Sequence, residues 1–222
     1  MIQLEHVTIA TGDKTIIHDV SLSVDTGQKA ALFGKSGSGK STILLSIMGA
    51  RPPVSGTIRL SGLVVSPATI QEVRQKVSYI SQEPVLGTRL VREALLLPFT
   101  FKAQAASHPS EQEIIAILEK LQLPFSILDM DVSVISGGEK QRIAIGRELL
   151  QKKNIFILDE VTSSLDRESK TAVMGLFRNS GYTVLSVSHD PGWMAICDTY
   201  YHVHSGTVKK VRDFRPFTGE LI

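Results

Sequence analysis

Apolar and polar residues alternate near the beginning of the chain, as they do in strands that bury one face. The alternation covers residues 1–9 and returns over residues 15–24, with Thr11-Gly12-Asp13 as a turn signal between them. A similar pattern over Thr57–Val65 is interrupted by Ser61-Gly62. We therefore expect a β-hairpin at the N-terminus and a second, small hairpin over residues 57–65.

Between these hairpins the pattern changes to continuous apolar runs. Lys29–Phe33 is a short run that ends at a glycine-rich segment, and its length suits a buried strand. Ser41–Met48 is apolar nearly all round and stops near Gly49, as a buried helix with a glycine at its C-terminus does. The sequence therefore predicts a strand, a glycine-rich loop and a helix in succession.

Helical spacing is typical of the middle of the chain. Ser110 and Glu113 form a capping box, with Ser110 as the N-cap. Apolar residues follow at helical spacing as far as Leu121. The helical pattern returns after Gly138. We therefore expect a mostly helical lobe over residues 85–150.

The last third of the chain again contains strand patterns. Ile155–Leu158 and Thr183–Ser188 are short apolar runs, which predict buried parallel strands with a helix between them. The runs Tyr200–Val203 and Thr207–Val211 flank Ser205-Gly206 and predict a closing hairpin.

Composition and charge exclude several classes of protein. Of the 222 residues, 42% are hydrophobic and 21% are charged, which is ordinary for a globular chain, and the net charge of +2 does not favour nucleic-acid binding. Cys197 is the single cysteine, so no internal disulfide can form. The longest stretch without a charged residue, Leu60–Gln71, is shorter than the roughly 20 residues that a membrane span needs. The N-terminus lacks a secretory signal pattern, so we expect a cytosolic chain that reaches a membrane only through a partner.

The sharpest chemical signal is the segment Gly34–Ser41, which fits the phosphate-loop pattern G-x-x-x-x-G-K-[ST]. Its glycines allow backbone N–H groups to approach phosphate oxygens, and the following helix presents its positive end to the anion. Lys40 supplies a charge for the β- and γ-phosphates, and the Ser41 hydroxyl is placed for Mg²⁺. An apolar strand precedes the loop and an apolar helix follows it, so we interpret the segment as a nucleotide site.

Two carboxylates follow the predicted strand at residues 155–158. Ligands bind at the carboxyl ends of the strands in open α/β sheets, where Asp159 suits the Mg²⁺ shell and Glu160 suits the orientation of an attacking water. His189 directly follows the next predicted strand and would reach the same edge, where it could contact the γ-phosphate. A carboxylate or histidine at a strand end is by itself often only structural, and the phosphate loop is what makes this group significant.

Two further segments complete the candidate site. Ser136-Gly137-Gly138 stands directly before a helical segment and forms a second possible anion cradle, although alone it is more typical of an ordinary helix start. Gln82 follows the apolar run Val77–Ile80 and could reach Mg²⁺ or water when the helical lobe moves.

Together these motifs resemble the ATP-binding-cassette (ABC) ATPases, the ATPase subunits of ABC transporters. The matching segments are the phosphate loop, the Gln82 loop, the signature Ile135–Arg142, the Walker B segment Ile155–Glu160, the Ser163–Asp166 loop and the switch histidine His189, in family order over essentially the whole chain. Within the family, residues 77–95 and the signature look most like small bacterial ATPases associated with iron export.

The resemblance implies an α/β fold with a P-loop nucleotide-binding core of ABC type. The core would consist of residues 1–84 and 151–222 and include an antiparallel β subdomain. The helical lobe of residues 85–150, which carries the signature, would be inserted into it.

The resemblance also implies ATP and Mg²⁺ as ligands. The catalytic residues would be Glu160, His189 and Lys40, and the metal ligands Ser41, Gln82 and Asp159. The nucleotide contacts would come from the phosphate loop and the residue after it, from the start of the signature helix, and from two separate positions, Gln82 and Ile9. The residues are Gly34, Lys35, Ser36, Gly37, Ser38, Gly39, Lys40, Ser41, Thr42, Gln82, Ser136, Gly137, Gly138, Glu139 and Ile9.

The implied partners are a second copy of the chain and a multi-span membrane permease. Two copies would face each other head to tail around ATP, on the cytoplasmic face of the bacterial inner membrane, and no nucleic acid would bind. An ABC ATPase of DNA repair or translation is an alternative, but the interval from Lys40 to Asp159 is only 119 residues and shows no sustained heptads. A non-catalytic ATP-binding regulator is a third reading, which the intact catalytic set argues against.

Three positions depart from the family pattern. Ile9 aligns best with the aromatic residue that usually stacks on adenine, which predicts looser base selection and tolerance of GTP. Ile135 replaces a leucine at the start of the signature, and Glu139 stands where glutamine is commonest. Neither of these two changes removes Ser136 or the glycines.

Overall fold

The computed structural model describes residues 1–215 and divides into two compact units. The first unit contains Met1–Tyr79, Asn154–Glu160 and the described residues from Ser180 onward. The second contains Ile80–Lys153 and Val161–Asn179. It therefore begins five residues before the expected helical lobe, ends three residues after it, and also takes in residues 161–179, which we had expected in the core.

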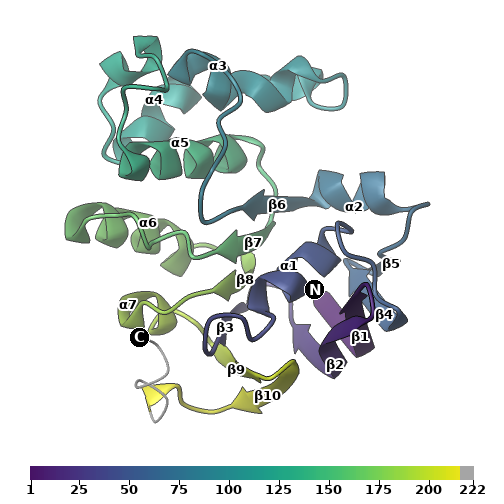
Figure 1. Cartoon of the computed structure of the whole chain (residues 1–222). Helices are drawn as coiled ribbons and strands as arrows, with labels where there is room; N and C mark the ends of the chain where they lie inside the picture. The colour runs from purple at the N-terminus through teal and green to yellow at the C-terminus, as the bar shows by residue number, and fades with distance from the viewer. Residues whose placement is uncertain (216–222) are drawn as a thin grey trace. The chain divides into compact units, whose positions relative to one another are not determined.

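The first unit contains an antiparallel sheet of four strands in the order β2-β1-β4-β5 (Figure 1). The expected N-terminal hairpin is confirmed: β1 and β2 pair antiparallel from Ile2 opposite Val24 to Thr11 opposite Lys14. The small hairpin is also confirmed, because β4 and β5 pair with each other and β4 pairs with β1. The strands span Ile2–Thr11 (β1), Lys14–Val24 (β2), Ser55–Leu60 (β4) and Leu63–Val64 (β5).

A second sheet has six strands in the order β10-β9-β3-β8-β7-β6. Its central strands β3, β8 and β7 run parallel, and every residue in them is buried, which agrees with their largely apolar sequences. The helix α1 packs against β7 and β4, and α2 and α7 are the other helices of this unit. The elements are β3 (Lys29–Phe33), β6 (Val77–Ile80), β7 (Ile155–Asp159), β8 (Thr183–Val187), β9 (Thr199–His204), β10 (Thr207–Val211), α1 (Lys40–Ile47), α2 (Ile70–Lys76) and α7 (Pro191–Met194).

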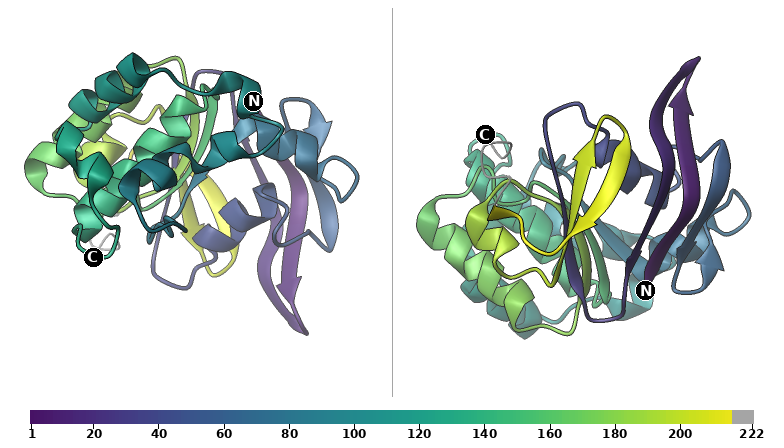
Figure 2. Two further views of the ribbon diagram at one scale, coloured as in Figure 1. Left: turned by 90° about the horizontal axis from the view of Figure 1, so that it is seen from above. Right: turned by 90° about the horizontal axis from the view of Figure 1, so that it is seen from below.

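The closing hairpin of β9 and β10 joins the two sheets of the first unit. Figure 2 shows this hairpin in yellow beside the long β1–β2 hairpin in purple, and β10 contacts β2. The Tyr201 hydroxyl on β9 donates a hydrogen bond to the Ser23 carbonyl at 2.6 Å and accepts one from the Ser23 N–H at 3.2 Å. The hairpin is thereby fixed to the edge of the antiparallel sheet.

The second unit is helical. Helix α5 packs against α3 and α4, and α4 also contacts α6. The expected capping box at Ser110 is confirmed, because its hydroxyl accepts a hydrogen bond from the Glu113 N–H while the Glu113 carboxylate accepts one from the Ser110 N–H. The helices are α3 (Val91–Leu96), α4 (Glu111–Lys120), α5 (Gly137–Leu150) and α6 (Arg167–Arg178), with 3₁₀ turns η1 (Leu97–Thr100), η2 (Ala105–Ser107) and η3 (Phe125–Asp129).

Within residues 1–215, every helix is too short or too polar to span a bilayer.

Candidate functional site

The loop between β3 and α1 needs glycine for two different reasons. Gly34 has a φ of 136°, and a Cβ atom built there would lie 2.1 Å from the Val203 carbonyl oxygen on β9. Gly37 also has a positive φ, of 76°, but a Cβ atom would meet no protein atom within 4 Å. Gly34 therefore allows the loop to pack on β9, whereas Gly37 leaves open space on the exposed side of the loop.

Lys40, the first residue of α1, points its ammonium group back into this loop. Its Nζ atom donates hydrogen bonds to the carbonyl oxygens of Gly34 at 2.6 Å and Lys35 at 3.0 Å. Burial lowers the pKa of Lys40 from its ordinary value, and the charges of Glu160 and Asp159 oppose that change. The loop thus encloses a positive charge with only partial compensation, which favours binding of an anion.

Ser41 and Asp159 come from distant parts of the sequence and meet in the first unit. The Ser41 hydroxyl donates a hydrogen bond to the Asp159 carboxylate. Burial raises the pKa of Asp159, a rise to which the nearby Glu160 charge adds, while the Ser41 hydrogen bond and Lys40 lower it. A hydroxyl and a carboxylate together are oxygen ligands of the kind that Mg²⁺ prefers.

Glu160 and His189 leave neighbouring strands at the same edge of the sheet. Glu160 has a φ of 48°, unusual for a residue with a side chain, and its N–H donates to the Val187 carbonyl on β8 at 3.0 Å. Its Oε1 atom lies 3.6 Å from Nε2 of His189. Burial, followed by the charge of Lys40, lowers the pKa of His189, and Glu160 opposes this. A neutral imidazole that can donate one hydrogen bond results at neutral pH.

These residues fit a nucleotide triphosphate with a divalent cation. The Lys40 ammonium and the open space at Gly37 suit phosphate oxygens, and the buried Ser38 hydroxyl has no hydrogen-bond partner among residues 1–215. The Ser41–Asp159 pair suits the cation. The sequence prediction thus identified residues that the fold brings together in one unit.

The signature segment lies in the second unit, at the start of α5. Ser136 is the N-cap of this helix, and its hydroxyl accepts from the Glu139 N–H at 3.2 Å and donates to the Glu139 carboxylate at 2.8 Å. A Cβ atom on Gly137 would meet nothing within 4 Å, whereas one on Gly138 would lie 3.1 Å from the Ser164 carbonyl. An exposed cradle of small residues therefore begins this helix. Gln82 is exposed in the same unit, in the segment that follows β6.

The expected base contact of Ile9 disagrees with its position. The Ile9 side chain is 0% exposed and belongs to the core cluster that also includes Val7 and Ile17. A side chain without accessible surface cannot stack on a base unless the core opens. The course of β1 explains the discrepancy, because Val7 and Ile9 both face the core beyond the irregularity between Leu4 and Val7.

One supporting contact could not be predicted from the sequence. The tip of the β9–β10 hairpin contacts the phosphate loop, because the Gly206 N–H donates to the Ser38 carbonyl at 3.3 Å and the Gly206 carbonyl accepts from the His18 N–H at 2.9 Å. Gly206 has a φ of 76°, and a Cβ atom there would lie 2.3 Å from the Ile16 carbonyl oxygen. The glycine turn at 205–206 is visible in the sequence, but its contact with the loop is not.

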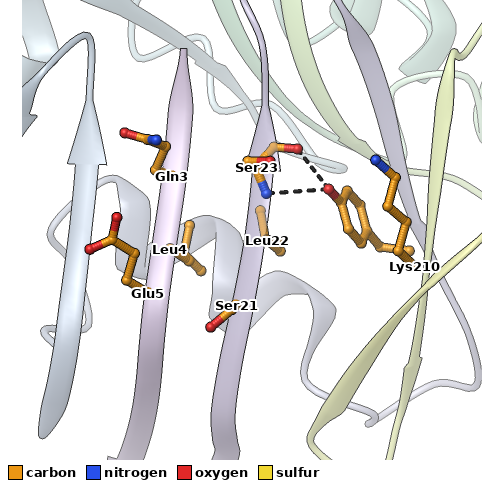
Figure 3. A pocket seen from close by; sticks show the side chains of 8 residues that line it. Gln3, Leu4, Glu5, Ser21, Leu22, Ser23 and Lys210 are labelled. Carbon is orange, nitrogen blue, oxygen red and sulfur yellow. Dashed lines mark hydrogen bonds between the residues drawn. The ribbon is translucent and has the colours of Figure 1, made fainter.

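A surface hollow of about 320 Å³ lies elsewhere in the first unit (Figure 3). None of the residues predicted for the nucleotide site lines it. The hollow lies beside the hydrogen-bonded pair Tyr201 and Ser23. Its lining residues are Gln3, Leu4, Glu5, Ser21, Leu22, Ser23, Tyr201 and Lys210.

Comparison with known proteins decides the family. Residues 17–163, more than half of the chain, match the family model described as ABC transporter. The chain belongs to the ABC transporter family. It is accordingly an ABC transporter ATPase, and ATP is the nucleotide that an ABC cassette binds.

Several ABC relatives are similar over most of their length. The chain is 33% identical to the probable iron export ATP-binding protein FetA of Escherichia coli over 96% of both chains. It is 31% identical to the energy-coupling factor transporter ATP-binding protein EcfA1 of Lactiplantibacillus plantarum, over 89% of this chain and 72% of that one. Among solved structures, the dimeric cassette MJ0796 in a post-hydrolysis state with ADP and Pi superposes with a TM-score of 0.84 at 25% identity, covering 96% of this chain and all of that one.

The different roles of Gly34 and Gly37 can be separated by matched substitutions to alanine. Both changes place alanine at a positive φ, which costs about 1–3 kcal/mol. Only Gly34→Ala adds a clash with a backbone atom, so we expect it to lower the unfolding temperature far more than Gly37→Ala. We expect Gly37→Ala to remove most of the stabilisation by ATP, which is about 2.7 kcal/mol for the native protein at a hundredfold excess over Kd. Thermal unfolding with and without MgATP measures both effects. Equal losses of stability, or an unchanged ATP effect in Gly37→Ala, would contradict this assignment.

The lowered pKa of His189 predicts a pH-dependent loss of stability. As pH falls below the ordinary value of 6.5, the unfolded chain binds a proton at this histidine before the folded chain does. The free energy of unfolding should therefore fall, relative to His189→Gln, as pH drops from about 6.5 to the folded pKa, and the difference should be constant above that window. Urea unfolding at several pH values measures it, with His204→Gln as the control at an exposed histidine. A difference that grows toward high pH would show the opposite shift.

Proposed function

We propose that the chain hydrolyses ATP at a site shared between two copies and drives a membrane permease. The observation that carries this proposal is the convergence of Lys40, Ser41, Asp159, Glu160 and His189 in one unit, with the exposed signature cradle in the other. Solved ABC cassettes that resemble this chain include dimers, which supports a second copy as the source of the opposing cradle.

Each residue has a role that its surroundings favour. The Lys40 ammonium would exchange its two loop carbonyls for phosphate oxygens, since charge-assisted hydrogen bonds are stronger than those to neutral carbonyls. Ser41, Asp159 and Gln82 would hold Mg²⁺, which neutralises charge on the phosphates when bound. Glu160 would orient the attacking water, and His189 would donate a hydrogen bond to the γ-phosphate.

The proposed closure depends on the γ-phosphate. In each site the loop Gly34–Ser41 of one copy and Ser136-Gly137-Gly138 of the other would enclose the triphosphate. Since only ATP carries the group that bridges both cradles, binding favours the closed pair and hydrolysis releases it. A permease that contacts the helical unit would convert this cycle into transport at the cytoplasmic face of the inner membrane.

We further propose that the transported substrate is a metal ion, with iron exported. Support comes from the similarity to FetA, which extends over 96% of both chains. Residues that contact the cargo would lie in the permease, so the cassette itself carries only the ATP-driven step.

Glu160→Gln tests the hydrolytic step. Glutamine has nearly the same size but cannot act as a base, so we expect turnover to fall about 10²–10⁴-fold while ATP binding is retained. The ATP-bound pair should then accumulate, as measured by size-exclusion chromatography with light scattering in the presence of MgATP. Glu119→Gln, on the exposed side of α4, is the matched control and should turn over normally. Full turnover by Glu160→Gln would remove Glu160 from the mechanism.

The cargo can be tested on the intact complex. We expect the chain to co-purify with a multi-span permease encoded beside it, and Fe²⁺ to stimulate the ATPase of the reconstituted complex more than Mn²⁺ or Zn²⁺ does. Metal should leave the cytoplasmic side only when ATP is supplied and Glu160 is intact. Stimulation by an unrelated solute, with no effect of any metal, would reject the metal proposal while retaining the transporter ATPase.

A further inference from the structure

Helix α5 carries a buried glutamine that faces a loop rather than the nucleotide cradle. Gln141 is 0% exposed, and its Nε2 atom donates a hydrogen bond to the Ser81 carbonyl at 3.3 Å. Both residues belong to the second unit. Among residues 1–215 its Oε1 atom has no hydrogen-bond partner. A buried amide with an unpaired oxygen lowers the stability of the fold, which indicates that Gln141 has a role at this position.

The contacted carbonyl belongs to the residue directly before Gln82. On the other side of Gln82, the Ser81 hydroxyl donates to the Glu83 carbonyl at 3.0 Å. The backbone around Gln82 is therefore held in two places. The Gln141 amide binds the carbonyl of the preceding residue, and the Ser81 hydroxyl binds the carbonyl of the following one. The Gln82 side chain is exposed, so these two hydrogen bonds fix its starting direction while leaving the side chain accessible.

Six residues further along the same helix, a second side chain holds the loop. The Arg147 Nη1 atom donates to the Leu86 carbonyl at 3.4 Å, and Arg147 is itself mostly buried. At its other end α5 begins with the signature residue Ser136, five residues before Gln141 and about 7.5 Å along the axis. One rigid helix thus connects the signature cradle to the Gln82 loop.

We propose that Gln141 is a positioning residue for ATP hydrolysis, which holds the Ser81 carbonyl and thereby sets the backbone from which Gln82 acts. This inference rests on the proposed function, in which Gln82 contacts Mg²⁺ or water. Gln141 touches neither nucleotide nor metal and acts only through the loop. Its Oε1 atom, unpaired among residues 1–215, is an acceptor that a loop N–H can use when the loop moves. The amide can therefore bind the loop in two positions, whereas an apolar side chain would form no hydrogen bond in either.

Gln141→Met tests the proposal by removing the amide while keeping an unbranched side chain of similar length. We expect kcat to fall about fivefold to tenfold, as the loss of one buried hydrogen bond predicts, with the KM for ATP unchanged. Gln151→Met is the matched control, because Gln151 lies at the C-terminus of the same helix. Among the residues that the structure describes, its side chain donates hydrogen bonds only to Glu148 and the Arg147 carbonyl. Its kcat should equal that of the native chain.

A double-mutant cycle with Gln82→Ala distinguishes positioning from a general structural effect. If Gln141 acts through Gln82, adding Gln141→Met to Gln82→Ala should lower kcat no further. Independent, multiplicative losses would overturn the proposal, as would a normal kcat in Gln141→Met. Gln141→Glu, which keeps the size but loses the donor, repeats the test should the methionine variant fail to fold.

Amide hydrogen exchange provides a measurement that does not depend on activity. We expect exchange in residues 82–86 to accelerate at least severalfold in Gln141→Met and to stay at the native rate in Gln151→Met. Native exchange rates in Gln141→Met would overturn the positioning role even if turnover fell. A native chain without ATPase activity would instead count against the proposed function, and the exchange comparison would still decide whether Gln141 holds the loop.

Discussion

The site depends on a buried ammonium group that the chain itself satisfies only in part. Lys40 sits at the beginning of α1, where the end of a helix already carries a partial positive charge, and its hydrogen bonds go to the neutral carbonyls of Gly34 and Lys35. A charge inside a protein needs an opposite charge to offset its lost hydration. Asp159 and Glu160 act on Lys40 at a distance, and both oppose the fall in its pKa. This arrangement fits an anion that brings its own cation, as the proposed MgATP would.

Parallel strands explain why the remaining groups converge. The register of β7 and β8 places Asp159 opposite Val187, so the residues that follow each strand leave the sheet at the same edge. Glu160 takes a left-handed conformation there, which costs stability and turns its carboxylate toward His189. Strain of this kind persists only where the surroundings fix it, and here the Glu160 N–H is held by the Val187 carbonyl. The stability lost at Glu160 is the cost of its orientation.

The sequence predicted the parts of this fold that depend on local pattern. Short, mostly apolar buried strands, such as β7 and β8, and helices with strong caps, such as α4, could be located from spacing alone. Helix α2 was missed because Val73 is its only buried residue and the other positions give no clear apolar stripe. Long-range contacts could not be predicted either. No local sequence pattern indicates the contact of Gly206 with Ser38 or that of Gln141 with Ser81. Ile9 is a prediction that the structure contradicts. The alignment placed it in contact with the base, whereas strand β1 buries its side chain in the core.

An anion bound at the signature cradle would lie beside the negative charge of Glu139, which a neighbouring residue partly offsets. The Ser136 hydroxyl already donates to Glu139, so it can serve a phosphate only by giving up that bond. Hydrogen bonds from Ser136 lower the pKa of Glu139, and the charge of Arg142 adds to that effect, so the carboxylate stays ionised beside the place where an anion would bind. Arg142 lies one turn further along α5 and donates to the carbonyls of Leu121 and Gln122. It partly offsets the carboxylate charge while remaining fixed to the helical unit. Glutamine at position 139 could keep the capping geometry without the negative charge. We therefore expect Glu139 to stabilise the free helix start and to weaken the proposed binding of phosphate there. We therefore expect this cradle to bind a triphosphate only when a second, stronger site already holds it, which agrees with the proposed site shared between two copies.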